Sequence, residues 1–153
     1  NAVTAVTVNA YEGEDNIIFR KHNQLTGKNF TIEEHSGDSK YLCKENCEEV
    51  ESVGGVPFFR PKSNTLVRSD GSYAWLRMML NYYNHPIKAK RSYNRRLNVE
   101  STIHAKKTKF GSHVRSKNDT AKENESTLQW IDYNFSVLSR ASYQCNIEPY
   151  FKK

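Results

Sequence analysis

The stretch from Lys28 to Phe59, KNFTIEEHSGDSKYLCKENCEEVESVGGVPFF, carries the pattern that decides the fold. Lys28 to His35 is short and rich in β-forming residues, which predicts a strand. Leu42 to Val53 favours a helix, and the two glycines that follow are typical of a helix C-terminus. Val56 to Phe59 then predicts a second strand. This order of strand, helix and strand is typical of a parallel pair of strands.

Upstream of that stretch the same alternation continues. Ala2 to Ala10 is β-branched and alternating, which predicts a further strand. Asn16 to Leu25 has apolar residues at a spacing that weakly favours a helix. The first part of the chain therefore predicts the order strand, helix, strand, helix, strand. We expect an α/β fold with right-handed crossovers and parallel pairing.

Downstream, the pattern changes to helices joined by polar loops. Tyr73 to Tyr83 is strongly apolar, which predicts a core helix. A helix beginning near Pro86 is expected to run through Glu100 to about Lys107. After a basic loop, Asp119 and Thr120 are candidate caps of a last helix. The apolar spacing of that helix predicts one buried face, made by Leu128, Ile131, Phe135 and Leu138.

Length and composition limit the class of protein. The chain has 153 residues, a length typical of one domain that can bury a hydrophobic core. No run of about 18 apolar residues is present, so we expect no transmembrane span. Three cysteines without a secretory signal favour a reduced, cytoplasmic setting. The first residue, Asn1, stands at the start of an expected strand, which predicts an N-terminally truncated sequence.

The charge is unevenly spread along a chain of net charge +6. Residues 1–57 hold ten acids and five bases, whereas residues 86–117 hold ten bases and one acid, Glu100. Such asymmetry predicts a polyanionic partner, with nucleic acid first. The alternative is a solvated basic tract without a partner.

The stretch Tyr93 to Lys107, YNRRLNVESTIHAKK, contains that single acid. As one helix it would place five side chains within an arc of roughly 80°. These side chains are Tyr93, Arg96, Glu100, His104 and Lys107. One carboxylate aligned with an aromatic ring and basic groups indicates a site. The alternative is a solvated basic helix with an internal ion pair such as Arg96–Glu100.

Asp38 and Glu100 form a candidate metal pair. A carboxylate at a strand end and another on a later helix can bind divalent metal through hard oxygens. Two such metals can activate a nucleophile and stabilise the leaving oxygen in phosphodiester transfer. Lysine and arginine nearby would hold the phosphates. The alternative for Asp38 is a turn aspartate that follows a glycine.

The spacing Tyr93-x2-Arg96-x3-Glu100-x6-Lys107 resembles the Tyr-Arg-Glu-Lys signature of DDE transposases of the insertion-sequence-four-like group. The segments around it are also similar to that family, over nearly the whole chain. The similar segments are Asn1-Ala-Val-Thr-Ala-Val-Thr-Val, Ser36-Gly-Asp-Ser-Lys-Tyr, Gly54-Gly-Val-Pro-Phe-Phe-Arg-Pro-Lys-Ser-Asn, Leu97-Asn-Val-Glu-Ser-Thr and Lys109-Phe-Gly-Ser-His-Val-Arg-Ser-Lys.

The resemblance implies that residues 1–153 are the C-terminal portion of a single RNase H-like catalytic domain, a mixed sheet flanked by helices. It implies that Asp38 and Glu100 are catalytic and hold two Mg²⁺ ions. Tyr93, Arg96 and Lys107 would bind transposon-end DNA. The implied reaction is hydrolysis at the transposon end followed by strand transfer to target DNA. The implied partners are transposon-end and target DNA and a second copy on paired ends, and the implied setting is the prokaryotic nucleoid.

The chain departs from the family at one carboxylate. The first catalytic Asp of the family would precede the segment matched by Asn1, and Asp15 does not take its place. We therefore expect this stretch to be inactive alone. His104 has no role in the signature, and a surface histidine is favoured over a DNA contact. The alternative functions are a non-catalytic DNA-binding remnant that uses residues 86–117 and, less favoured, a small metal-dependent nuclease.

Overall fold

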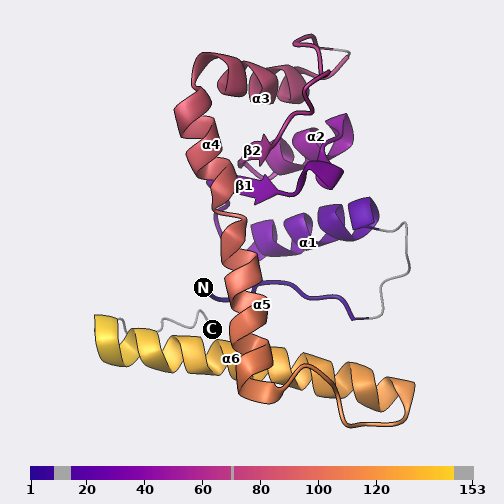
Figure 1. The fold of residues 1–153 in the computed structure, drawn as a ribbon, viewed down its shortest axis with the longest axis vertical. Helices are drawn as coiled ribbons and strands as arrows, with labels where there is room; N and C mark the ends of the chain where they lie inside the picture. The colour runs from indigo at the N-terminus through magenta and orange to yellow at the C-terminus, as the bar shows by residue number, and fades with distance from the viewer. Residues whose placement is uncertain (9–14, 70, 147–153) are drawn as a thin grey trace. The chain divides into compact units, whose positions relative to one another are not determined.

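The computed structural model describes residues 1–8, 15–69 and 71–146. These residues form a mixed α/β structure that is mostly helical, with six α-helices and one two-stranded parallel sheet. The contacts divide the chain into two compact units (Figure 1). We call Ala10–Leu97 the sheet unit, and Asn1–Asn9 with Asn98–Lys153 the helical unit.

The sheet unit confirms the predicted alternation of helices and strands after residue 15. The order is α1 (Asp15–Asn29), β1 (Glu34–Gly37), the short 3₁₀ helix η1 (Ser39–Tyr41), α2 (Lys44–Ser52), β2 (Val56–Phe59), α3 (Tyr73–Asn84) and α4 (Pro86–Asn94). The predicted strand from Lys28 to His35 begins too early, because its first two residues complete α1. The predicted strand Val56–Phe59 and the helix from Tyr73 are confirmed.

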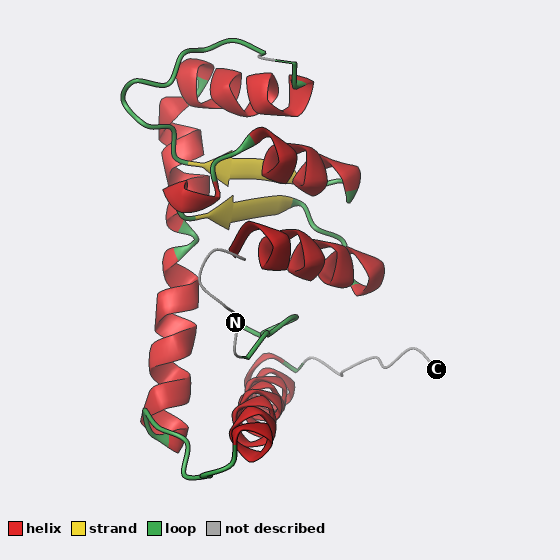
Figure 2. Ribbon diagram, turned by 90° about the vertical axis from the view of Figure 1, so that its right-hand side faces the viewer, coloured by secondary structure: helices red, strands yellow, loops and turns green. Residues whose placement is uncertain are grey.

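The two strands pair in parallel, as predicted, with Glu34 opposite Val56 and Gly37 opposite Phe59. Figure 2 shows both arrows pointing in the same direction. Helix α2 makes the crossover, and it stops where Gly54 adopts a φ of 85°. This left-handed conformation is easily reached only by glycine. The amide of the next residue donates to the carbonyl of Val50, which satisfies an end of α2.

The core of the sheet unit lies where α1, α2, β2 and α3 meet. Its fully or nearly buried members are Phe19, Cys47, Val50, Phe59, Ala74, Met78 and Met79. Gly37 makes close strand packing possible, because a Cβ there would lie 2.7 Å from the ring of Phe59. Side chains alternate between faces along a strand, so Phe58 lies on the opposite face from Phe59. Helix α4 contacts both strands and buries Tyr93.

The helical unit contains α5 (Leu97–Phe110), apart from its first residue, and α6 (Asp119–Cys145). Helix α6 is capped by Asn118, whose side chain accepts bonds from the amides of Thr120 and Ala121. The predicted caps Asp119 and Thr120 are therefore wrong, since both residues already lie in α6 and the cap is Asn118. The loop before α6 is held by Glu125, whose carboxylate accepts from the backbone amides of Arg115 and Ser116.

The strand predicted for Ala2–Ala10 is wrong over the residues that the structure describes there, 1–8; Asn9 and Ala10 lie outside the described residues. Residues 1–7 have no regular secondary structure. The side chain of Asn134 on α6 accepts from the Val3 amide at 2.8 Å and donates to the Val3 carbonyl at 2.7 Å. These bonds satisfy the backbone as a neighbouring strand would. A β-branched sequence forms a strand only where a partner strand pairs with it.

The predicted buried face of α6 is wrong. Leu128, Ile131, Phe135 and Leu138 are 63%, 46%, 61% and 36% exposed. The side chain of α6 that is buried among the described residues is Tyr133, on another face. Its hydroxyl donates to the carbonyl of Asn1, and its ring packs edge-on against Trp130 at 6.0 Å. The spacing identified an apolar stripe correctly, but a stripe shows only which face can be buried.

Phe135→Ala should therefore change the free energy of unfolding by less than about 1 kcal/mol, because an exposed ring loses little packing. Tyr133→Ala in the same helix should cost roughly 2 kcal/mol or more, since it removes a buried ring and its hydrogen bond. Urea unfolding of the two variants measures the difference. If Phe135→Ala lowered the free energy of unfolding more than Tyr133→Ala, the exposed position of the apolar stripe of α6 would be contradicted.

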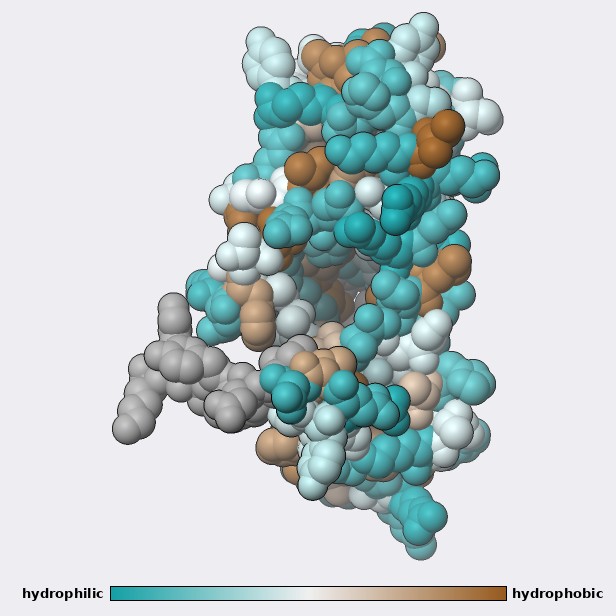
Figure 3. All heavy atoms as spheres, turned by 90° about the vertical axis from the view of Figure 1, so that its left-hand side faces the viewer, coloured by the Kyte–Doolittle hydropathy of each residue, from teal (hydrophilic) through white to brown (hydrophobic). Residues whose placement is uncertain are grey.

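None of the helices that the structure describes combines the length and the apolar character needed to cross a membrane. Polar side chains cover most of the face drawn in Figure 3, and apolar side chains are scattered among them.

Candidate nucleic-acid and metal site

Asp38 follows directly after β1, at the strand end where the sequence predicts it. It is the N-cap of η1: its Oδ1 accepts from the Lys40 amide at 3.3 Å and from the Ser39 hydroxyl at 3.1 Å. The bonds from Lys40 and Ser39 hold the pKa of the Asp38 carboxyl below its usual range. Asp38 is thus a turn aspartate, and it is also an ionised carboxylate at the end of a parallel strand.

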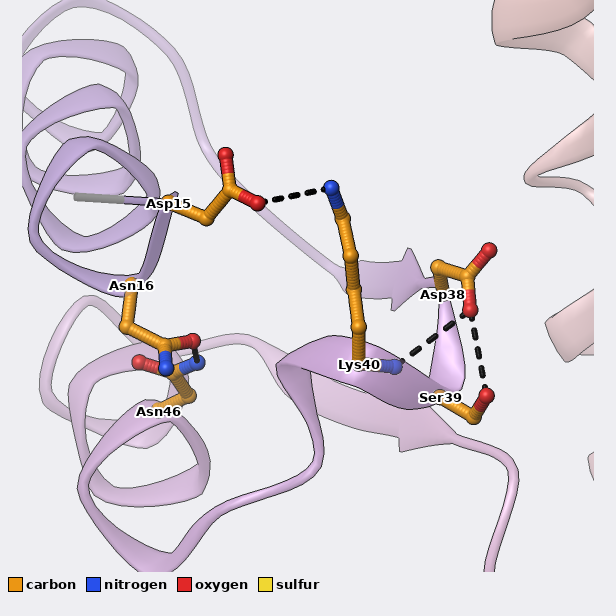
Figure 4. Close-up of polar contacts among 6 residues, drawn as sticks. All are labelled: Asp15, Asn16, Asp38, Ser39, Lys40 and Asn46. Carbon is orange, nitrogen blue, oxygen red and sulfur yellow. Dashed lines mark hydrogen bonds and ion pairs between the residues drawn. The ribbon is translucent and has the colours of Figure 1, made fainter. Parts of the chain in front are cut away.

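The hydrogen bonds from the Ser39 hydroxyl and the Lys40 amide both go to Oδ1 of Asp38 (Figure 4). The residue is exposed, so a ligand can approach it. A hard carboxylate oxygen of this kind suits a divalent cation such as Mg²⁺.

A polar arrangement beside Asp38 was not predicted from the sequence. The Nζ of Lys40 lies 2.9 Å from the Oδ2 of Asp15, at the start of α1. Figure 4 shows Lys40 extending toward Asp15 and not toward the carboxylate of Asp38. In the same view Asn46 of α2 donates to Asn16 of α1 at 2.9 Å. No local spacing connects Asp15 with Lys40, because the two meet only through the packing of α1 on η1.

The junction between α4 and α5 corrects the predicted helix. The sequence predicts one helix from Pro86 to about Lys107, but α4 ends at Asn94 and α5 begins at Leu97. At the junction the amides of Arg95 and Arg96 donate to carbonyls three residues back, at 3.1 Å each. This is the tighter turn of a 3₁₀ helix, which changes the angular spacing of side chains. The predicted arc of roughly 80° assumed α-helical spacing and does not apply across this turn.

Tyr93 and Arg96 nevertheless lie together. The guanidinium carbon of Arg96 is 5.2 Å from the centre of the Tyr93 ring, a cation–π distance. Tyr93 is 9% exposed and fixed in the packing of α4. A buried aromatic ring thus orients the guanidinium. The neighbouring Arg95 pairs with Glu34 at 2.9 Å, which ties the end of α4 to β1.

Arg96 also acts on Asp38. The positive charge of Arg96 contributes to the lowered pKa of the Asp38 carboxyl, after the hydrogen bonds from Lys40 and Ser39. The sheet unit therefore brings together three of the predicted site residues, Asp38, Tyr93 and Arg96. Two of them come from α4 and its end, and the third comes from the turn after β1.

Glu100 and Lys107 lie on α5, in the helical unit, and both are exposed. Glu100 is in the first turn of α5 and Lys107 in the last. Seven residues apart, they share one face of the helix and are separated by about 10 Å along its axis. Across residues 1–8, 15–69 and 71–146, no group of three or more His, Cys, Asp and Glu side chains is placed to hold a metal ion.

The chain matches no protein-family model, and neither a curated protein nor a solved structure is detectably similar to it.

Proposed function

We propose that this chain is part of a DDE transposase that acts on DNA, and that its sheet unit belongs to an RNase H-like catalytic domain. One observation carries the proposal. Arg96, oriented by the Tyr93 ring, lies close enough to Asp38 to influence its pKa. The Tyr-Arg signature and the carboxylate after β1 are distant in sequence, and a catalytic site of this family requires them together. The parallel pair β1–β2 with its crossover helix α2 is compatible with that fold.

In this proposal the cations and the aromatic ring bind DNA. Arg96 offers a planar guanidinium that can donate two parallel hydrogen bonds to a phosphate. Lys107, exposed in the last turn of α5, contributes a second positive charge. Tyr93 positions Arg96 by stacking against it.

Asp38 and Glu100 would hold Mg²⁺. Asp38 suits this role because hydrogen bonds lower the pKa of its carboxyl and its side chain is exposed. Glu100 supplies an exposed carboxylate on α5. When bound, Mg²⁺ would activate a water or a 3′ hydroxyl and stabilise the leaving oxygen of a phosphodiester. The residues of this chain would hold the metal and orient the DNA phosphate beside it.

A second candidate function is DNA binding without catalysis. It is favoured by the exposed cations of α4, which lie outside the Tyr-Arg-Glu-Lys signature: Lys88, Lys90 and Arg91. Cations on an exposed helix can bind phosphates without any contribution from a carboxylate.

Fluorescence anisotropy with a labelled DNA duplex tests the proposal. We expect the dissociation constant to rise steeply with salt, because bound cations displace counterions from the phosphates. Arg96→Gln and Lys107→Gln should each weaken binding and each reduce the salt slope by about 1. Lys28→Gln is the matched control: it removes the same charge from an exposed position on α1 and should bind as the parent does.

Mg²⁺ separates the two functions. If Asp38 and Glu100 hold the metal, Mg²⁺ should strengthen DNA binding by the parent chain, and Asp38→Asn or Glu100→Gln should remove that effect. DNA binding that Mg²⁺ and the two substitutions leave unchanged would favour the non-catalytic function. An affinity that does not fall as salt rises would count against both functions.

A further inference from the structure

The helical unit contains a groove that the Tyr-Arg-Glu-Lys signature does not include. It lies between α5 and α6, which cross in Figure 1, and its volume is about 490 Å³. Helix α5 contributes His104, Thr108 and Lys109, and α6 contributes Ser136 and Arg140. Among the described residues that line the groove, the charged side chains are the cations Lys109 and Arg140, and the carboxylate of Asp132 lies beside them, 3.5 Å from the Nζ of Lys109. The groove therefore offers several nitrogen donors.

Arg140 is the donor best placed to bind a ligand in this groove. Its side chain lines the groove from α6 and is exposed. Among the described residues, no hydrogen bond or ion pair engages it. A guanidinium presents its donors as a planar fork, which matches the oxygens of a phosphate.

Lys109 is held at the same groove by α6. Its Nζ donates to the hydroxyl of Ser136 and lies 3.5 Å from the Oδ2 of Asp132. The side chains of this ion pair are 42% and 58% exposed, so the pair contributes little to stability. Lys109 can thus turn from Asp132 to an incoming anion at small cost.

The groove adjoins the part of α5 that carries the signature. His104 lies four residues after Glu100 and three before Lys107, so the three side chains share one helix face. His104 also lines the groove, and its Nδ1 is 3.5 Å from the hydroxyl of Thr108. A polyanion bound along α5 at Lys107 would therefore reach the groove within one helical turn.

We propose that this groove binds a phosphate group through Arg140 and Lys109, with His104 at its edge, and that the phosphate belongs to a DNA backbone. The choice of DNA as the source rests on the proposed function. The phosphate site itself rests on the groove and its donors.

The first arm of the test measures duplex DNA binding by the full chain. Arg140→Gln should weaken binding about fivefold and reduce the salt slope by about 1, as the loss of one phosphate contact does. Arg140→Lys should keep the slope, because it keeps the charge. Lys122→Gln is the control: it removes one charge from α6 outside the groove, where Lys122 pairs with Asp119 at 2.7 Å.

The second arm titrates inorganic phosphate and follows the backbone NMR signals of α5 and α6. Phosphate should shift the signals of groove residues in the parent chain and not in Arg140→Gln. If the chain does not bind DNA but phosphate still shifts the NMR signals of the groove residues, the phosphate site is supported and DNA is ruled out as the source of the phosphate. If Arg140→Gln binds DNA as Lys122→Gln does and phosphate shifts no groove signal, the proposal is overturned.

Discussion

Phe59→Ala should lower the free energy of unfolding by about 3–5 kcal/mol, the usual cost of truncating a buried phenylalanine. Phe59 is 0% exposed at the end of β2, where it packs edge-on against Phe19 at 5.6 Å. Its ring also fills the space that Gly37 leaves open in β1. A loss of this size is comparable to the total stability of many domains, so the variant should be partly unfolded at 25 °C.

Two further variants make this result interpretable. Phe59→Leu keeps most of the buried volume and should cost only about 1–2 kcal/mol, so it can be measured if Phe59→Ala does not fold. Phe30→Ala removes the same atoms from a position that is 58% exposed and should cost less than about 1 kcal/mol. Urea unfolding compares all three. Equal losses for Phe59→Ala and Phe30→Ala would contradict the buried position of Phe59.

The stretch around Phe59 also shows how far the fold could be predicted. From Asp15 to Phe59 the local signals agree with one another: apolar spacing, a glycine stop after α2 and two short β-prone runs. That region has the predicted order and the predicted parallel pairing. The predictions are wrong where the structure of a segment depends on which other segment of the chain packs against it. Residues 1–8 alternate like a strand, but their backbone bonds go to Asn134, and the apolar stripe of α6 is exposed.

In the candidate site, too, some features could be predicted from local sequence and others could not. The position of Asp38 after a strand could be predicted, because a short β-prone run leads directly into it. The pairing of Arg96 with Tyr93 could also be predicted, since residues three positions apart lie close together in a helical turn. The tight turn at Arg95–Arg96 could not, because no glycine or proline marks it. The Lys40–Asp15 ion pair depends on tertiary packing and has no local signal.

Acid should destabilise the sheet unit through His35, a core-facing residue of β1. Its ring lies 4.7 Å from that of Phe19, and its Nδ1 is 2.9 Å from the side-chain oxygen of the buried Asn23. Burial lowers the pKa of His35 from 6.5 to about 4. The unfolded chain therefore binds the proton at a higher pH than the folded chain does. The contribution of His35 is complete above pH 6.5 and is lost as the pH falls to about 4, by roughly 3 kcal/mol in total.

Urea unfolding at pH 7, 5.5 and 4 measures this loss, and His35→Gln identifies its source. Glutamine can still donate to Asn23 and does not titrate, so the variant should be less stable than the parent at pH 7 and lose less stability on acidification. His22, whose pKa is also lowered by burial and by Lys21, acts in the same direction and remains in both chains. The difference between their pH profiles therefore isolates His35. If the unfolding free energies of the parent and of His35→Gln fell in parallel from pH 7 to 4, the neutral imidazole of His35 would not stabilise the packing of β1 on α1.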